Sequence, residues 1–238
     1  MNYNSPFIKM LEAIANMLIV SFLWFIFSLP LLTIIPASAA LYHTTNKIIF
    51  GPGKGNGVFK DFFDSYKLNL IPGIKLNLIM IVAALFIAEG LWTGYQFYRV
   101  SIWGMLYMML GVLITAIVIT ALVYVPPVLS RFIAPVSSII RIAVYFAMRK
   151  PIRSLLYLVL FLFMIYAIQA FPLALLIVPA LYTDLVRTYL ERDMKQFIAD
   201  NGLEEMASEE EEEEIEEEAE SMVDIEEKLS SKRKGTKK

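Results

Sequence analysis

Few residues in this chain could take part in chemistry. The sequence has no cysteine and a single histidine, His43, so it offers no thiolate nucleophile, no disulfide and little scope for a His-ligated metal or a Ser-His-Asp arrangement. One acidic residue, Glu89, falls clearly inside an apolar stretch. An ionisable side chain within a membrane span is a candidate functional site, although water or Arg99 could also satisfy it near the helix end. We expect that the protein is not an enzyme, and we predict no cofactor and no metal.

Two prolines and a serine form a second candidate site at the end of the first apolar stretch. Pro30 and Pro36 each lack an amide donor, which favours a kink or break in a helix. Ser38 lies among the small residues of the run 37–40, which would let another helix approach closely. Two interpretations stay open: a kinked packing helix, or a discontinuous helix around a binding site, as transporters use.

The elements that must position these residues are apolar helices. Hydrophobic residues make up 58% of the chain and charged residues 18%, against about 45–50% and 25% in soluble domains. The predicted fold class is all-α: a polytopic helical membrane protein with about five transmembrane helices, within a range of four to six. Residues 1–198 form this domain, with spans expected at about 10–42 (kinked, as one helix or two), 71–95, 102–129, 153–170 and 173–189.

An amphipathic helix is predicted over residues 58–70, before the second span. Phe59, Phe62, Phe63 and Tyr66 fall on one face of a helix, and Lys60, Asp61, Asp64, Ser65 and Lys67 take the other. This helix has too few apolar residues to cross a bilayer. We expect it to lie in the cytoplasmic interface, either as a simple anchor or with its aromatic face docked on a partner protein.

The charges divide the chain into two parts. Residues 199–238 hold sixteen acidic and six basic residues, so the body keeps fifteen basic and seven acidic ones. An unbroken run of glutamates, 209–214, repels itself at helical spacing, so a disordered, solvated acidic tail is predicted. A basic body with few acids suits a lipid bilayer as partner, and no nucleic-acid partner is predicted.

The basic residues of the body also predict an orientation. Residues 45–70 and 130–153 are rich in Lys and Arg, whereas the segment after the second span has only Arg99. Basic loops stay in the cytoplasm. Five spans with the N-terminus outside and the C-terminus in the cytoplasm satisfy this pattern.

Three features together resemble a known family: the apolar first span, the segment PASAALY followed by a basic loop, and the segment FKDFFDSYKLNL. They are similar to the YesL-like family of small integral membrane proteins, mostly of Gram-positive bacteria, grouped as a domain of unknown function. The resemblance covers roughly residues 15–190 and is most specific from Leu29 to Leu70. It implies a plasma-membrane protein associated with carbohydrate uptake, as a companion of sugar ABC transporters. The family has no established catalytic residues to carry over.

Two functions are therefore kept. The first is an accessory or regulatory membrane protein, partnered by a sugar ABC transporter permease or a membrane sensor kinase, with Phe59, Phe62, Phe63 and Tyr66 as the docking face. The second is a small autonomous permease that uses Glu89 and the Pro30/Pro36 helix break. Self-association is left open in both.

Overall fold

The computed structural model describes residues 6–49, 57–98 and 101–200. The chain divides after Arg187 into two compact units. Of the second unit, the described part is the rest of the last helix, up to Asp200. The predicted acidic tail, apart from its first two residues, lies outside the described residues.

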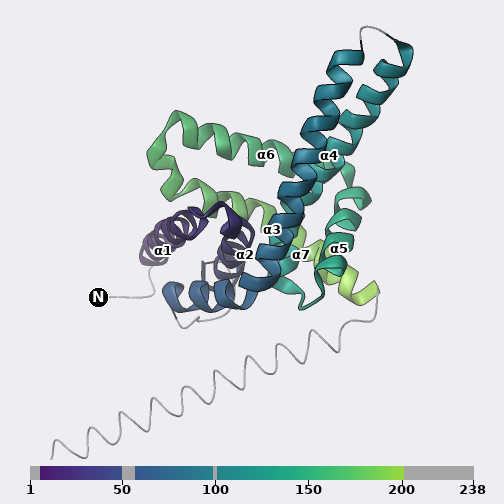
Figure 1. The fold of residues 1–238 in the computed structure, drawn as a ribbon. Coiled ribbons are helices and arrows are strands. Elements are labelled where there is room, and N and C mark those ends of the chain that lie inside the picture. Colours follow the sequence, from purple (N-terminus) through teal and green to yellow (C-terminus); the bar gives the residue numbers. More distant parts are fainter. Residues whose placement is uncertain (1–5, 50–56, 99–100, 201–238) are drawn as a thin grey trace, which may run out of the picture. The chain divides into compact units, whose positions relative to one another are not determined.

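Every regular element within these ranges is helical (Figure 1). The longer helices are α1 (Pro6–Ser28), α3 (Val58–Phe97), α4 (Ile102–Arg131), α6 (Pro151–Ala170) and α7 (Val178–Asp200). Shorter helices are α2 (Ile34–Thr44) and α5 (Val136–Arg149), the 3₁₀ segments η1 (Leu31–Thr33) and η3 (Pro172–Leu176), and the π-helical segment η2 (Thr45–Ile49). The predicted all-α fold class is confirmed.

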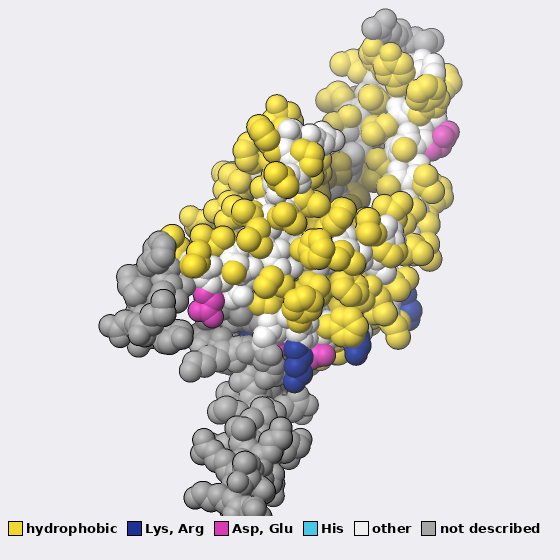
Figure 2. Space-filling model, turned by 90° about the vertical axis from the view of Figure 1, so that its left-hand side faces the viewer, with side chains coloured by type: hydrophobic (Ala, Val, Ile, Leu, Met, Phe, Trp, Pro, Cys, Tyr) yellow, Lys and Arg dark blue, Asp and Glu magenta, His cyan; other side chains and the backbone are white. Residues whose placement is uncertain are grey.

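Four of these helices are long and apolar enough to cross a membrane: Met10–Ser28 of α1, α3, α4 and α6. At most 22% of each apolar stretch is buried inside the molecule, and the face drawn in Figure 2 is largely covered by hydrophobic side chains. Apolar surfaces of this kind contact lipid in a membrane, where a helix can form its backbone hydrogen bonds within itself. The chain is an all-α polytopic membrane protein.

The expected fifth span, 173–189, is not one of these helices. Phe171 is extended, and η3 then gives way to α7, which continues to Asp200 and is too polar over its length to be a candidate span. Pro172 is the first residue of η3, and Pro179 lies in the first turn of α7, where it would interrupt a helix that continued from Pro172. The charged residues Asp184, Arg187 and Arg192 then follow within α7. Opposite sides for the two termini would therefore require a further crossing after α6.

Residues 58–70 and 71–95 are not two helices but one, α3. Its 40 residues span about 60 Å, twice the hydrocarbon thickness of a bilayer. Pro72 is accommodated inside the helix. It removes one backbone hydrogen bond, and proline is the usual cause of a helix bend. In Figure 1 the first turns of α3 run in a different direction from the rest of the helix.

The basic segment 130–153, read from the sequence as a loop, contains the helix α5. Its buried residues, Ile139, Ala143, Phe146 and Ala147, recur at helical spacing. This period was visible in the sequence, but the segment was interpreted from its charge alone.

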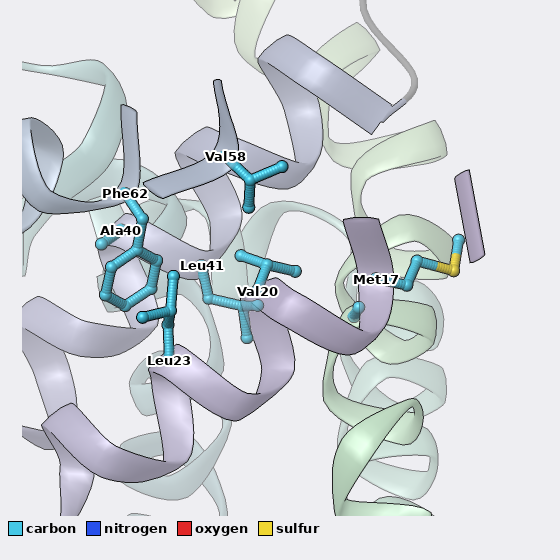
Figure 3. Packing of buried hydrophobic residues seen from close by; sticks show 8 residues of the cluster. Met17, Val20, Leu23, Ala40, Leu41, Val58 and Phe62 are labelled. Atoms are coloured by element: carbon cyan, nitrogen blue, oxygen red, sulfur yellow. The ribbon is translucent and has the colours of Figure 1, made fainter. Parts of the chain in front are cut away.

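The first span, 10–42, is two helices rather than one kinked helix, because α1 ends at Ser28 and α2 begins at Ile34. The two helices pack together with the start of α3. Their shared core is drawn in Figure 3, where Val20 and Leu23 of α1 meet Leu41 of α2 and Phe62 of α3.

Candidate functional site

The chain turns between α1 and α2 at Pro30. Pro30 is extended (φ −71°, ψ 112°) and disfavours a helical conformation at the residue before it. The Thr33 hydroxyl lies 2.6 Å from the carbonyl oxygen of Phe27 and 2.7 Å from that of Pro30. The side-chain amide of Asn77 on α3 donates to the carbonyl oxygen of Leu31 at 2.7 Å. Three carbonyls at the break, those of Phe27, Pro30 and Leu31, thus have side-chain hydrogen-bond partners within the protein.

Pro36 does not break the helix. It lies in the first turn of α2, where its missing N–H would have no helical partner in any case. Its ring packs directly on Gly73 of α3: a Cβ atom on Gly73 would come within 2.7 Å of Pro36 Cδ. Absence of a side chain at Gly73 is what allows α2 to approach α3 this closely.

Ser38 joins α2 to α1. Its Oγ accepts a hydrogen bond of 3.0 Å from the indole Nε1 of Trp24. The three residues predicted as a site, Pro30, Pro36 and Ser38, are therefore brought together by the fold, and each is used in holding α1, α2 and α3 in place. This arrangement favours the interpretation of the break as a packing element.

A stripe of small and polar residues on α3 faces this junction. It consists of Asp61, Ser65, Asn69, Gly73 and Asn77, which recur every four residues and are all buried. The side-chain amide of Asn69 donates to the carbonyl oxygen of Ser65, one turn earlier in α3, at 2.9 Å. In membranes, helices associate through small residues and interhelical hydrogen bonds rather than through apolar burial. Through this stripe α3 contacts α2 at Gly73 and the turn before α2 at Asn77.

The predicted docking face is consequently divided. Phe62 is fully buried, and Tyr66 is half-buried. Both rings pack against Phe27 of α1, with centroids 5.7 Å and 4.8 Å away. Phe59 and Phe63 are 65% and 42% exposed. The prediction of one exposed face with Phe59, Phe62, Phe63 and Tyr66 is wrong, because Phe62 and Tyr66 belong to the core and Asp61 and Ser65 do not lie on the outer face.

Two of the four aromatic residues remain exposed, and together with the exposed Lys67 they form a smaller surface that we call the α3 patch: Phe59, Phe63 and Lys67. The Lys67 ammonium lies 4.5 Å from the centroid of the Phe63 ring. A cation over an aromatic face is a favourable contact that places charge and apolar surface side by side. The patch therefore suits an amphipathic partner better than a purely apolar one.

Glu89 lies apart from this junction. It is exposed, and the hydroxyl of Thr93 lies 3.5 Å from its Oε1. Sixteen residues separate it from Gly73 along α3, which is about 24 Å of helix. The structure does not bring Glu89 together with Pro30, Pro36 or Ser38. Within the described residues, no three His, Asp or Glu side chains lie close enough together to hold a metal ion.

The buried stripe of α3 is absent from the residues predicted from the sequence as functional. Its signal was the strict four-residue spacing of small and polar residues, which begins in the amphipathic segment and continues past Pro72 into the span. A period that crosses the expected boundary at residue 70 also indicates one helix rather than two.

Comparisons with known proteins address the same region. Residues 17–90 match the family model described as "Protein of unknown function, DUF624". This segment contains most of α1, the turn at Pro30, α2 and most of α3. No curated protein and no solved structure matches the chain. The resemblance is thus confirmed over residues 17–90, which match the model of the DUF624 family of proteins of unknown function, the family that includes the YesL-like proteins.

Proposed function

We propose that this protein is a non-enzymatic accessory component of a membrane system for carbohydrate uptake, and that it binds its partner through the α3 patch. The observation that carries the proposal is the exposure of Phe59 and Phe63 beside Lys67, on the polar half of a helix whose other half is a candidate span. Exposed aromatic rings next to a charge are enriched where proteins bind one another. The partner class, a sugar ABC transporter permease or a membrane sensor kinase, follows from the family resemblance.

The geometry around Pro30 supports a scaffold in preference to a transport path. A path through a broken helix uses free backbone groups to coordinate the substrate. Here the carbonyl oxygens of Phe27, Pro30 and Leu31 accept hydrogen bonds from Thr33 and Asn77. Glu89, the acidic residue that a permease would use, lies about 24 Å along α3 from Gly73, the residue of α3 that contacts Pro36.

The proposed location is the plasma membrane, with the start of α3 and the helix α5 on the cytoplasmic side, since both carry basic residues. The N-terminus outside and the C-terminus in the cytoplasm remain predictions, and together they need a crossing that the four candidate spans do not provide.

The test is co-purification of partners by the tagged protein in mild detergent, with cross-linking and mass spectrometry. The decisive variant is Phe59→Ala/Phe63→Ala, which removes both exposed rings. Because the Phe63 ring also meets the Phe27 ring edge-on, with centroids 5.8 Å apart, thermal unfolding must first show that the variant is folded. The matched control is Leu68→Ala/Ile71→Ala, which removes two apolar side chains from the same part of α3 that are at least as exposed as Phe59 and Phe63.

The proposal expects a permease or sensor kinase with the wild type and the control, and at least a tenfold lower recovery with the patch variant. Full recovery with the patch variant would show that docking lies elsewhere. Recovery of the wild type alone, or only as its own oligomer, would contradict the accessory function.

A further inference from the structure

The helix α5 is held in a fixed position between two candidate spans, α4 and α6. The Ser154 hydroxyl of α6 donates to the carbonyl oxygen of Ala147 on α5 at 2.9 Å. The Tyr124 hydroxyl of α4 lies 2.7 Å from Ser154 Oγ and donates to it, since the serine proton is already used. The Phe146 ring of α5 stacks on Tyr124 at 6.2 Å between centroids. This junction fixes which face of α5 is turned outward.

The outward face of α5 is basic. Arg141, Tyr145 and Arg149 follow one another at intervals of four residues and are exposed. The guanidinium carbon of Arg149 lies 5.5 Å from the centroid of the Tyr145 ring. Arg131, Lys150 and Arg153 adjoin the two ends of the helix, and the sequence has no acidic residue between Glu89 and Asp184.

Exposed apolar side chains flank these bases. Ile133, Met148 and Ile152 are 74%, 63% and 85% exposed. Because α5 connects the end of one candidate span to the start of the next, it lies at a membrane surface. A short helix with exposed arginines, a tyrosine and a methionine, flanked by an exposed isoleucine beyond each end, is suited to the boundary between headgroups and acyl chains.

We propose that the outward face of α5 is a binding site for anionic phospholipids, with Arg141 and Arg149 on the headgroup phosphate and Met148 and Ile152 against the acyl chains. The guanidinium group donates a pair of parallel hydrogen bonds to a phosphate, which an ammonium group cannot do. The positive-inside rule places this surface against the cytoplasmic leaflet, where anionic lipids attract basic residues next to spans. The basic charge of this face suits an anionic occupant. A lipid is favoured over a protein, because α5 adjoins the ends of two candidate spans, α4 and α6, which lipid surrounds.

The test uses the full-length protein in neutral detergent and native mass spectrometry. The probes are phosphatidylglycerol and phosphatidylcholine in an equimolar mixture. The wild type should retain phosphatidylglycerol in preference. The variant Arg141→Gln/Arg149→Gln should bind phosphatidylglycerol about 25-fold more weakly, since each basic residue near an anionic surface contributes about fivefold, with binding of phosphatidylcholine unchanged.

Two further variants separate geometry from net charge. Arg141→Lys/Arg149→Lys keeps the charge and should recover only part of the affinity. Lys60→Gln/Lys75→Gln removes the same charge from exposed positions on α3 and should retain most of the selectivity. If the double glutamine variant does not fold, Arg141→Gln alone replaces it, with an expected loss of about fivefold.

Three results would contradict the proposed phospholipid site on α5. The first is equal retention of the two lipids by the wild type. The second is an equal loss of selectivity in the α3 control, which would indicate diffuse attraction to the whole basic body. The third is displacement of phosphatidylglycerol by millimolar inorganic phosphate, which would indicate a site for a free anion rather than a lipid.

Discussion

Gly73 of α3 lies against the ring of Pro36 of α2, and a Cβ atom at Gly73 would come within 2.7 Å of Pro36 Cδ and 2.8 Å of Pro36 Cβ. Neither ring atom can rotate away, because the proline ring is fixed to its own backbone. This contact sets the distance between the two helices at the centre of the DUF624 segment.

The substitution Gly73→Ala should therefore lower the free energy of unfolding by about 1–3 kcal/mol, as overpacking does in a close-packed interior. Gly90→Ala in the same helix is the matched control, because its new Cβ would meet the Tyr107 hydroxyl at an ordinary 3.4 Å. The control should be neutral or slightly stabilising, since alanine favours helix by about 1 kcal/mol over glycine. Thermal unfolding in detergent, followed by tryptophan fluorescence, measures both variants, and equal melting temperatures would contradict the tight contact.

Phe62 and Phe59 should differ in stability although they are three residues apart on one helix. Phe62 is fully buried against Phe27, so Phe62→Ala should cost about 3–5 kcal/mol through lost packing and a cavity. Phe59→Ala, at a residue 65% exposed, should change stability by less than about 0.5 kcal/mol. The same unfolding assay compares them, and a large loss in Phe59→Ala would mean that its ring is covered in the native protein.

Asn77 should stabilise the turn at Pro30 by its hydrogen bond to the carbonyl oxygen of Leu31. Asn77→Leu keeps the size of the side chain and removes the donor. We expect a loss of about 0.6–2 kcal/mol, the range for polar contacts between membrane helices, and faster proteolysis at the turn. Leu78→Ala, at the next and exposed position, is the control. If Asn77→Leu is as stable as the wild type, the hydrogen bond to Leu31 does not stabilise the turn.

The absence of native cysteine makes orientation directly measurable with single-cysteine variants. Ser101→Cys, before α4, should react with an impermeant maleimide in intact cells, and Ser137→Cys, on α5 beyond α4, should react only after lysis. The reason is the basic character of α5 and the candidate span that separates the two positions. Ser5→Cys then reports the side of the N-terminus. Reaction of Ser101→Cys and Ser137→Cys from the same side would show that α4 does not cross the membrane.

The sequence by itself determined the class of this protein and the approximate position of four apolar spans. Hydrophobic composition, length and the near absence of charge in α4 and α6, each of which has a single arginine close to one end, depend on short-range pattern. In a bilayer such apolar segments form helices. The resemblance that is most specific from Leu29 to Leu70 lies within residues 17–90, which match the DUF624 model.

Tertiary structure alone decided which face of α3 is buried. Amphipathic spacing predicted that Phe59, Phe62, Phe63 and Tyr66 lie together on one face of the helix. Packing against α1 and α2 instead buries Phe62 and Asp61 and leaves Phe59 exposed. Hydrophobicity does not distinguish lipid from protein as a neighbour inside a membrane, so small and polar residues select the interface. For the same reason the packing role of Pro36, which depends on a glycine 37 positions away, becomes visible only when α2 and α3 are placed together.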